Sequence, residues 1–233
     1  MPITTDTATT IENSAVLLRL LQLASSTLPV GAYSYSQGLE WAVEEGLIIN
    51  KDDTKQWIVT VLIHSISRLD APVLARMFDG WANDNTDAVG YWNDYLLACR
   101  DTRELRDEDK HLGRALRKLL GDLGLPWPER QSDQQLSFAI SFSFAAVQWN
   151  IPKTAMISGY LWSWLENQVL AAIKLVPLGQ VAGQRILLDS AVLIPSLIQQ
   201  AIKLTDEDIG GALPVLAIAS SRHETQYTRL FRS

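Results

Sequence analysis

Apolar residues recur at helical spacing along almost the whole chain, in segments separated by short loops that contain glycine or proline. Trp57, Ile58, Val61 and Leu62, for example, lie three or four residues apart in overlapping pairs. Residues at this spacing share one face of a helix, so the pattern is typical of an amphipathic helix. We therefore predict an all-α fold, a single-domain bundle of roughly eight to ten helices.

Capping residues, proline and glycine set the expected helix boundaries. Ser14 suits the start of the first helix, and Pro29 and Gly31 suit its end. The further helices are expected at 36–45, at 52–69, from Asp70, over 86–120 as one or two helices broken near Gly113, from 132 or 133 to 149, at 152–176, and from 179 onward, where Pro195 should kink or split the helix.

One segment also fits a strand. Residues 137–144 alternate, with phenylalanine at even positions. We favour a helix there, because Ala139, Ala145 and Ala146 suit one and because no hairpin turn flanks the segment.

Composition excludes several classes of protein. The formal net charge of -6 is poorly suited to nucleic acid, which requires clustered cations. Charged residues or proline interrupt every apolar stretch, so we expect no membrane span and no membrane partner. The first 13 residues have neither a basic nor an apolar region of a secretory signal, and Cys99 is the only cysteine. We expect a cytoplasmic protein in a reducing compartment.

Sites for enzyme chemistry are weak in this sequence. The pair His223-Glu224 resembles part of the zinc motif His-Glu-x-x-His, but Tyr227 stands where the second histidine is needed. A metallohydrolase using His223 and Glu224 is therefore the alternative function, and we expect no catalytic residue, metal site or cofactor. The charged run from Arg100 to Lys118 is interpreted as a solvated helix face.

The last thirteen residues, 221–233, combine arginine, tyrosine, leucine and phenylalanine. Apart from leucine, these types are enriched at the centres of protein interfaces. We predict a flexible segment over 1–13, an all-helical domain over 14–220 and a partner-binding tail over 221–233. The alternative is a tail that packs on its own domain.

Four ordered blocks resemble the UreF family of urease accessory proteins. They are residues 21–40, Thr102-Arg103-Glu104 with Gly113, residues 174–184, and the tail. The resemblance covers about residues 14–233. It implies an all-helical, dimeric, non-catalytic scaffold that binds UreD (also called UreH) and the GTPase UreG. It also implies that this assembly inserts nickel into apo-urease in a GTP-dependent step.

The resemblance and the residue types together suggest two groups of binding residues. The tail residues expected to bind UreD are His223, Glu224, Tyr227, Arg229, Leu230, Phe231 and Arg232. The residues expected at the UreG surface or at a dimer surface are Tyr33, Tyr35, Gly38, Glu40, Lys174, Gln180 and Gln184. For Lys174 the alternative is a lysine whose stem lies along an apolar surface, and for the two glutamines it is a simple helix contact.

Overall fold

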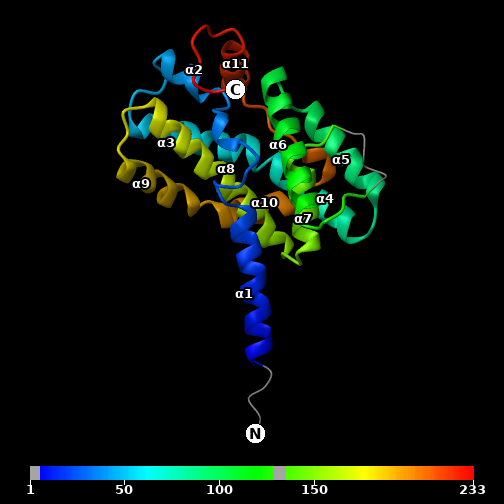
Figure 1. The fold of residues 1–233 in the computed structure, drawn as a ribbon. Helices are drawn as coiled ribbons and strands as arrows, with labels where there is room; N and C mark the ends of the chain where they lie inside the picture. Colours follow the sequence, from blue (N-terminus) through cyan, green and yellow to red (C-terminus); the bar gives the residue numbers. More distant parts are fainter. Residues whose placement is uncertain (1–5, 129–134) are drawn as a thin grey trace.

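The protein is all-helical in the computed structural model, which describes residues 6–128 and 135–233 (Figure 1). The α-helices in those ranges are α1 Asp6–Leu23, α2 Leu39–Glu44, α3 Lys51–Val61, α4 Asp70–Ala82, α5 Thr86–Ala98, α6 Arg103–Asp122, α7 Phe138–Gln148, α8 Lys153–Leu175, α9 Gln180–Ala191, α10 Ile194–Lys203 and α11 Pro214–His223. The turns η1 Ala32–Ser34 and η4 Asp206–Asp208 are 3-10 helices, and η2 Leu62–Ile66 is a π-helical turn. The predicted single all-α domain is confirmed, with slightly more helices than expected.

Two boundaries differ from the prediction in the first half of the chain. Helix α1 begins at Asp6, so residues 6–13, which we assigned to a flexible segment, are helical. The break within 86–120 falls just before α6, because the Thr102 hydroxyl oxygen accepts a hydrogen bond from the Leu105 N–H at 3.3 Å and caps the helix. Gly113 continues α6 instead. A Cβ at Gly113 would collide with the carbonyl oxygens of residues 136 and 137, so this glycine permits the close approach of the chain that leads into α7.

The second half of the chain confirms two predictions and differs from the prediction in two places. Residues 138–148 form helix α7, capped by Ser137, which confirms helix over strand. Its predicted start at 132 or 133 lies outside the described residues, and residues 135–137 are not helical. Pro195 splits the following helix as expected, and it lies in the first turn of α10, where its missing N–H breaks no hydrogen bond. Helix α11 was not predicted, and its last turn includes residues 221–223 of the predicted tail.

Helix α4 lies at the centre of the domain, packed against α5, α7, α8 and α10. Leu74 and Met77 of α4 and Phe142 of α7 are fully buried there. Burying side chains of this size contributes roughly 1.5–3 kcal/mol each, so this contact is a main source of the fold's stability.

A buried ion cluster fixes α6 against this core. The Arg100 Nη2 atom lies 2.6 Å from an oxygen of Asp70 and 2.7 Å from an oxygen of Asp109. Asp109 also accepts a hydrogen bond from the Phe138 N–H at 2.6 Å. The charged run 100–118 is therefore not entirely a solvated face, since Asp109 and Glu108 are buried within it. The cluster positions the first turns of α6.

Helices α2 and α11 lie together at one end of the molecule, beside the last residues of the chain, whereas α1 projects from the body (Figure 1). Within the part of the chain that the structure describes, no single helix is long and apolar enough to cross a membrane. Two strongly bent pairs, α3–η2 with α4 and α9 with α10, reach that length and composition only together.

Candidate functional site

Glu40 is a buried carboxylate in the first turn of α2 that binds the tail. It accepts hydrogen bonds from the backbone N–H groups of Leu230, at 2.6 Å, and Phe231, at 2.9 Å. Hydrogen bonds to an ionised group are stronger than those between neutral groups. Glu40 therefore holds the tail by its backbone, whichever side chains stand at positions 230 and 231.

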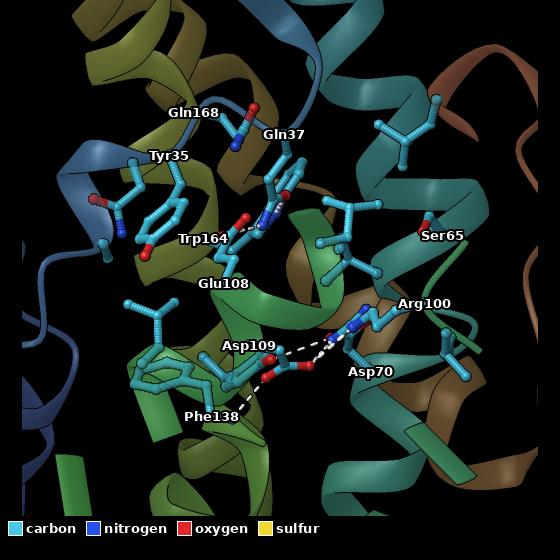
Figure 2. A pocket seen from close by; sticks show the side chains of 18 of the residues that line it. Tyr35, Gln37, Ser65, Asp70, Arg100, Glu108, Asp109, Phe138, Trp164 and Gln168 are labelled. Carbon is cyan, nitrogen blue, oxygen red and sulfur yellow. Dashed lines mark hydrogen bonds and ion pairs between the residues drawn. The ribbon is translucent and has the colours of Figure 1, made fainter. Parts of the chain in front are cut away.

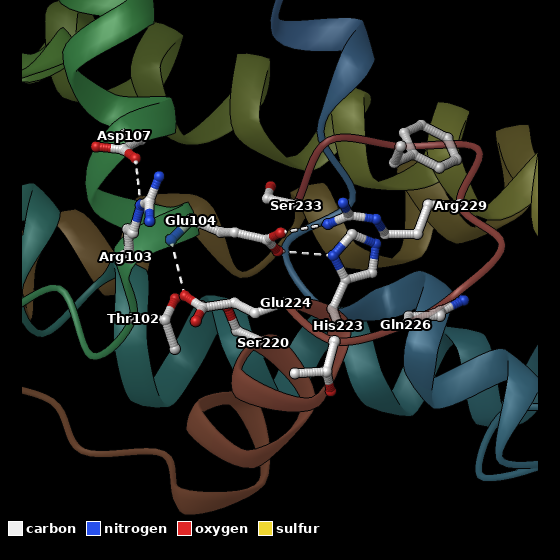
Figure 3. Close-up of polar contacts among 12 residues, drawn as sticks. Thr102, Arg103, Glu104, Asp107, Ser220, His223, Glu224, Gln226, Arg229 and Ser233 are labelled. Carbon is white, nitrogen blue, oxygen red and sulfur yellow. Dashed lines mark hydrogen bonds and ion pairs between the residues drawn. The ribbon is translucent and has the colours of Figure 1, made fainter.

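A second carboxylate, Glu104 in the first turn of α6, binds the side chains of His223 and Arg229 (Figure 3). One of its oxygens lies 2.7 Å from His223 Nδ1 and the other lies 2.6 Å from Arg229 Nη1. The Nε2 atom of His223 lies 3.1 Å from Glu40, and the imidazole is fully buried between the two glutamates. A neutral imidazole has one N–H, so both contacts are hydrogen bonds when the ring carries two protons or one glutamate is protonated.

The third carboxylate, Glu108, lies one turn further along α6. It accepts hydrogen bonds of 2.8 Å from Gln37 Nε2 and from the Ser233 hydroxyl. Burial raises the pKa of Glu108 to about 7, although both hydrogen bonds act in the opposite direction. The amide oxygen of Gln37 accepts a hydrogen bond of 2.8 Å from the Trp164 indole, which links this cluster to α8. We call Glu40, Glu104 and Glu108 the carboxylate cluster.

Beneath the carboxylate cluster is a cavity of about 80 Å³ (Figure 2). Gln37, Trp164, Glu108 and Gln168 line it, as does Asn167, whose buried side-chain oxygen has no hydrogen-bond partner among the described residues. The lining is largely apolar but includes these polar groups, and a cavity of this size suits small molecules such as water beside them.

Gly38 brings α2 against α11. Its φ is +80°, and a Cβ there would lie 2.9 Å from the Ser220 backbone nitrogen and 3.0 Å from the Ala219 Cβ. Only glycine adopts this conformation without strain and also leaves room for the second backbone. Gly38 thereby lets Glu40 reach the tail.

A cation lies above aromatic rings at the surface of the site. The Lys174 Nζ atom lies 5.4 Å from the centre of the Phe231 ring and 5.9 Å from that of Tyr33. Phe231 is buried, whereas Tyr33 and Lys174 are exposed. Contacts of this kind contribute about 0.5–1 kcal/mol at exposed positions. They form a compact surface of one cation and one exposed ring over the end of the tail.

Comparisons with known proteins agree with this architecture. The UreF family model matches residues 48–191. The chain is 50% identical over 216 residues to the urease accessory protein UreF of Alkalilimnicola ehrlichii, covering 92% of this chain and 95% of that protein. It is 50% identical to UreF of Azoarcus sp. (93% and 95%) and 46% identical to UreF of Teredinibacter turnerae (93% and 98%).

The chain belongs to the UreF family.

These UreF relatives are named as accessory proteins, which confirms that the chain is not an enzyme. The geometry agrees, because both ring nitrogens of His223 are used by glutamates and Glu224 accepts a hydrogen bond from the Glu104 N–H at 3.1 Å. Among the described residues, no group of three or more metal-binding side chains is arranged to hold an ion.

Three of the four blocks that resemble UreF meet at the carboxylate cluster. The first supplies Glu40, with Tyr33, Tyr35 and Gly38 nearby, the second supplies Glu104, and the tail supplies His223, Arg229 and Ser233. The third block contributes Lys174. Tyr35 is buried, which raises the pKa of its hydroxyl, and a hydrogen bond with Arg232 opposes that shift.

Some predicted residues lie elsewhere. Gln180 and Gln184 are exposed on α9, in the same helix as Gly183, which packs against Ile173 of α8. Tyr227 and Leu230 point to solvent, with exposed fractions of 102% and 66%. Phe231 and Ser233 are buried within the chain, as the alternative of a tail packed on its own domain predicts for the whole tail. Part of the tail is therefore covered by its own domain, and the side chains of Tyr227 and Leu230 are left exposed.

Sequence reasoning missed Glu108 and Gln37. Glu108 follows Glu104 by four residues, so the two lie on one face of α6, and this spacing was visible in the sequence. The alternation of charges around them nevertheless suggested a solvated face. Gln37 has a positive φ of 53°, a backbone conformation that cannot be predicted from the sequence.

Proposed function

We propose that this protein of the UreF family is a non-catalytic scaffold in urease maturation. It binds UreD (UreH) and the GTPase UreG, and the assembly inserts nickel into apo-urease in a GTP-dependent step. The observation that carries the proposal is the convergence of the family blocks on one surface. Their histidine and carboxylates hold the tail in place there, so the site is built for protein contact.

The tail is ordered before any partner arrives. Fixing a residue costs roughly 1–2 kcal/mol in backbone entropy, and hydrogen bonds to charged groups contribute about 1.5–3 kcal/mol each. The hydrogen bonds from the tail backbone to Glu40 and the burial of Phe231 offset that cost within the chain. A partner therefore meets a preformed surface, which lowers the entropy that binding must overcome.

The exposed residues divide the surface into two parts. Leu230 offers an apolar anchor beside Arg229 and Arg232, and we assign this part to UreD. Lys174 and Tyr33 form the second part, assigned to UreG or to a second copy in a homodimer. The net charge of -6 and the helical surface fit a cytoplasmic protein with protein partners, without nucleic acid or membrane.

Co-purification from cells that express the partners tests the assignment. We expect Leu230→Asp to remove UreD from the complex, while Leu123→Asp, at another exposed leucine, retains it. Deletion of 229–233 should also remove UreD without loss of helical circular dichroism. Lys174→Ala and Tyr33→Ala should reduce UreG recruitment. Full UreD binding by the deleted chain, or normal urease activation by both substitutions, would contradict the proposal.

A further inference from the structure

Two hollows lie between α11, with the residues next to it, and the chain from α2 to α3, and no residue of the carboxylate cluster lines them. Val215 lines one and Ile218 the other, and these two residues lie three apart on the same face of α11. We call the two hollows together the α2–α11 groove. Its apolar lining includes Trp41, Leu47, Trp57, Val215, Ile218 and Tyr227.

Large apolar side chains in this groove face solvent. The exposed fractions are 52% for Leu47, 55% for Ile218 and 102% for Tyr227. Single exposed apolar residues are common, but neighbouring ones gathered in a groove indicate a binding surface. Tyr227, one of the predicted tail residues, thus belongs to this surface and not to the anchored part of the tail.

Each hollow is also lined by a residue with a buried polar atom. Trp57 lines one hollow and Gln226 the other, and neither the buried indole nitrogen of Trp57 nor the buried amide oxygen of Gln226 has a hydrogen-bond partner among the described residues. A buried group left unpaired is costly, so an occupant that supplies both an acceptor and a donor gains affinity. A protein segment supplies a carbonyl oxygen for Trp57 and an N–H for Gln226, whereas a lipid chain supplies neither.

The groove carries more negative than positive charge, which favours an occupant with cationic side chains. Three carboxylates line it, those of Glu44, Glu45 and Asp53, against one guanidinium, that of Arg222. Within the described ranges, Glu44 and Glu45 are exposed and form no ion pair. Cationic side chains on a partner would complement them and would be repelled from a basic surface.

We propose that the α2–α11 groove is a second docking surface, which binds a protein segment with apolar anchors flanked by lysine or arginine. This surface lies beyond the proposed function, because it involves neither Leu230 nor Lys174. Its occupant inserts apolar side chains beside Leu47 and Ile218. Its main chain pairs with Trp57 and Gln226, and its cations lie against Glu44 and Glu45.

Fluorescence anisotropy with the full-length chain tests the proposal. The probe is a labelled synthetic peptide that alternates leucine with lysine, and the matched control peptide carries glutamate in place of lysine. We expect only the lysine peptide to bind, and more weakly at high salt. Ile218→Glu should weaken binding about tenfold or more. Trp57→Phe, which removes the indole N–H, should weaken it about three- to tenfold.

Two further variants keep the result interpretable. Leu188→Glu, at an exposed leucine of α9, should bind the peptide like the wild type. Reversing both exposed charges, with Glu44→Lys and Glu45→Lys, should leave circular dichroism unchanged and transfer the preference to the glutamate peptide. The proposal is overturned if the wild type binds neither peptide, if it binds both equally, or if Leu188→Glu weakens binding as much as Ile218→Glu. It is also overturned if phosphatidylcholine vesicles bind through Ile218 while the peptides do not.

Discussion

The hydroxyl of Ser233 donates a hydrogen bond to Glu108, a residue 125 positions earlier in the chain, at a distance of 2.8 Å. Gln37 donates to the other oxygen of the same carboxylate. Three segments that are remote in sequence thus share one buried acceptor. The ionisation of Glu108 therefore affects both the stability of the fold and the hold on the tail.

Glu108→Gln should alter how stability depends on pH. The folded-state pKa of about 7 lies above the ordinary value of 4.5, so the folded protein binds this proton more tightly than the unfolded chain does. The stability that the group contributes is full below about pH 4.5 and is lost as pH rises through 7, by on the order of 3 kcal/mol. We expect the variant to gain stability relative to the wild type between about pH 5 and pH 8. Urea denaturation at several pH values measures this, and parallel profiles would contradict it.

His223→Ala should destabilise the protein by about 2–5 kcal/mol, because it leaves the carboxyl groups of Glu40 and Glu104 without the hydrogen-bond partner that they share. His64→Ala is the matched control, since His64 is exposed on η2, and its effect should stay within about 0.5 kcal/mol. Denaturant unfolding at neutral pH compares the two. Equal effects of the two substitutions would mean that the buried contacts of His223 contribute nothing to stability.

Gly38→Ala separates backbone strain from steric clash. Gly31 and Gly38 both have positive φ, 85° and 80°, but a Cβ at Gly31 meets no atom within 4 Å. Alanine at Gly31 should cost about 1 kcal/mol from strain alone, whereas at Gly38 the collision with α11 adds roughly 1–3 kcal/mol. Thermal unfolding of the two variants measures the difference. A smaller loss at Gly38 than at Gly31 would contradict the close approach of α2 and α11.

Phe231→Ala should release the tail without unfolding the domain. Phe231 is 5% exposed. Residues 230 and 231 are fixed both by the packing of this ring and by the hydrogen bonds from their backbone N–H groups to Glu40. We expect faster hydrogen exchange of the amides of residues 230 and 231, with little change in the core helices. Leu230→Ala, at an exposed side chain, should leave that protection intact. Protection that survives in Phe231→Ala would show that the hydrogen bonds alone hold the tail.

Local patterns were sufficient for the fold but not for the site. Periodicity predicted all-α structure, and Pro195 predicted the split of α9 from α10, because both effects act over a few residues. Gly113 misled the prediction, because its role is a contact with residues 136–137 that helix propensity does not encode.

Half of the candidate site was accessible from sequence through the family blocks. Glu40, Glu104 and His223 stood in those blocks, but their meeting depends on the packing of α2, α6 and α11, which no local pattern specifies. The burial of Glu108 could not be predicted either. A glutamate in a charge-rich helix is ordinarily solvated, and here Gln37 and the tail residue Ser233 cover it.

The tail affects the order in which parts of the protein fold during synthesis. During synthesis the earlier helices leave the ribosome first and can pack around α4 before residues 223–233 exist. Glu40, Glu104 and Glu108 then stay open to water, since their covers come from His223, Arg229 and Ser233. The nascent chain thus keeps an acidic pocket open to water until residues 223–233 have been synthesised and have packed onto the earlier helices.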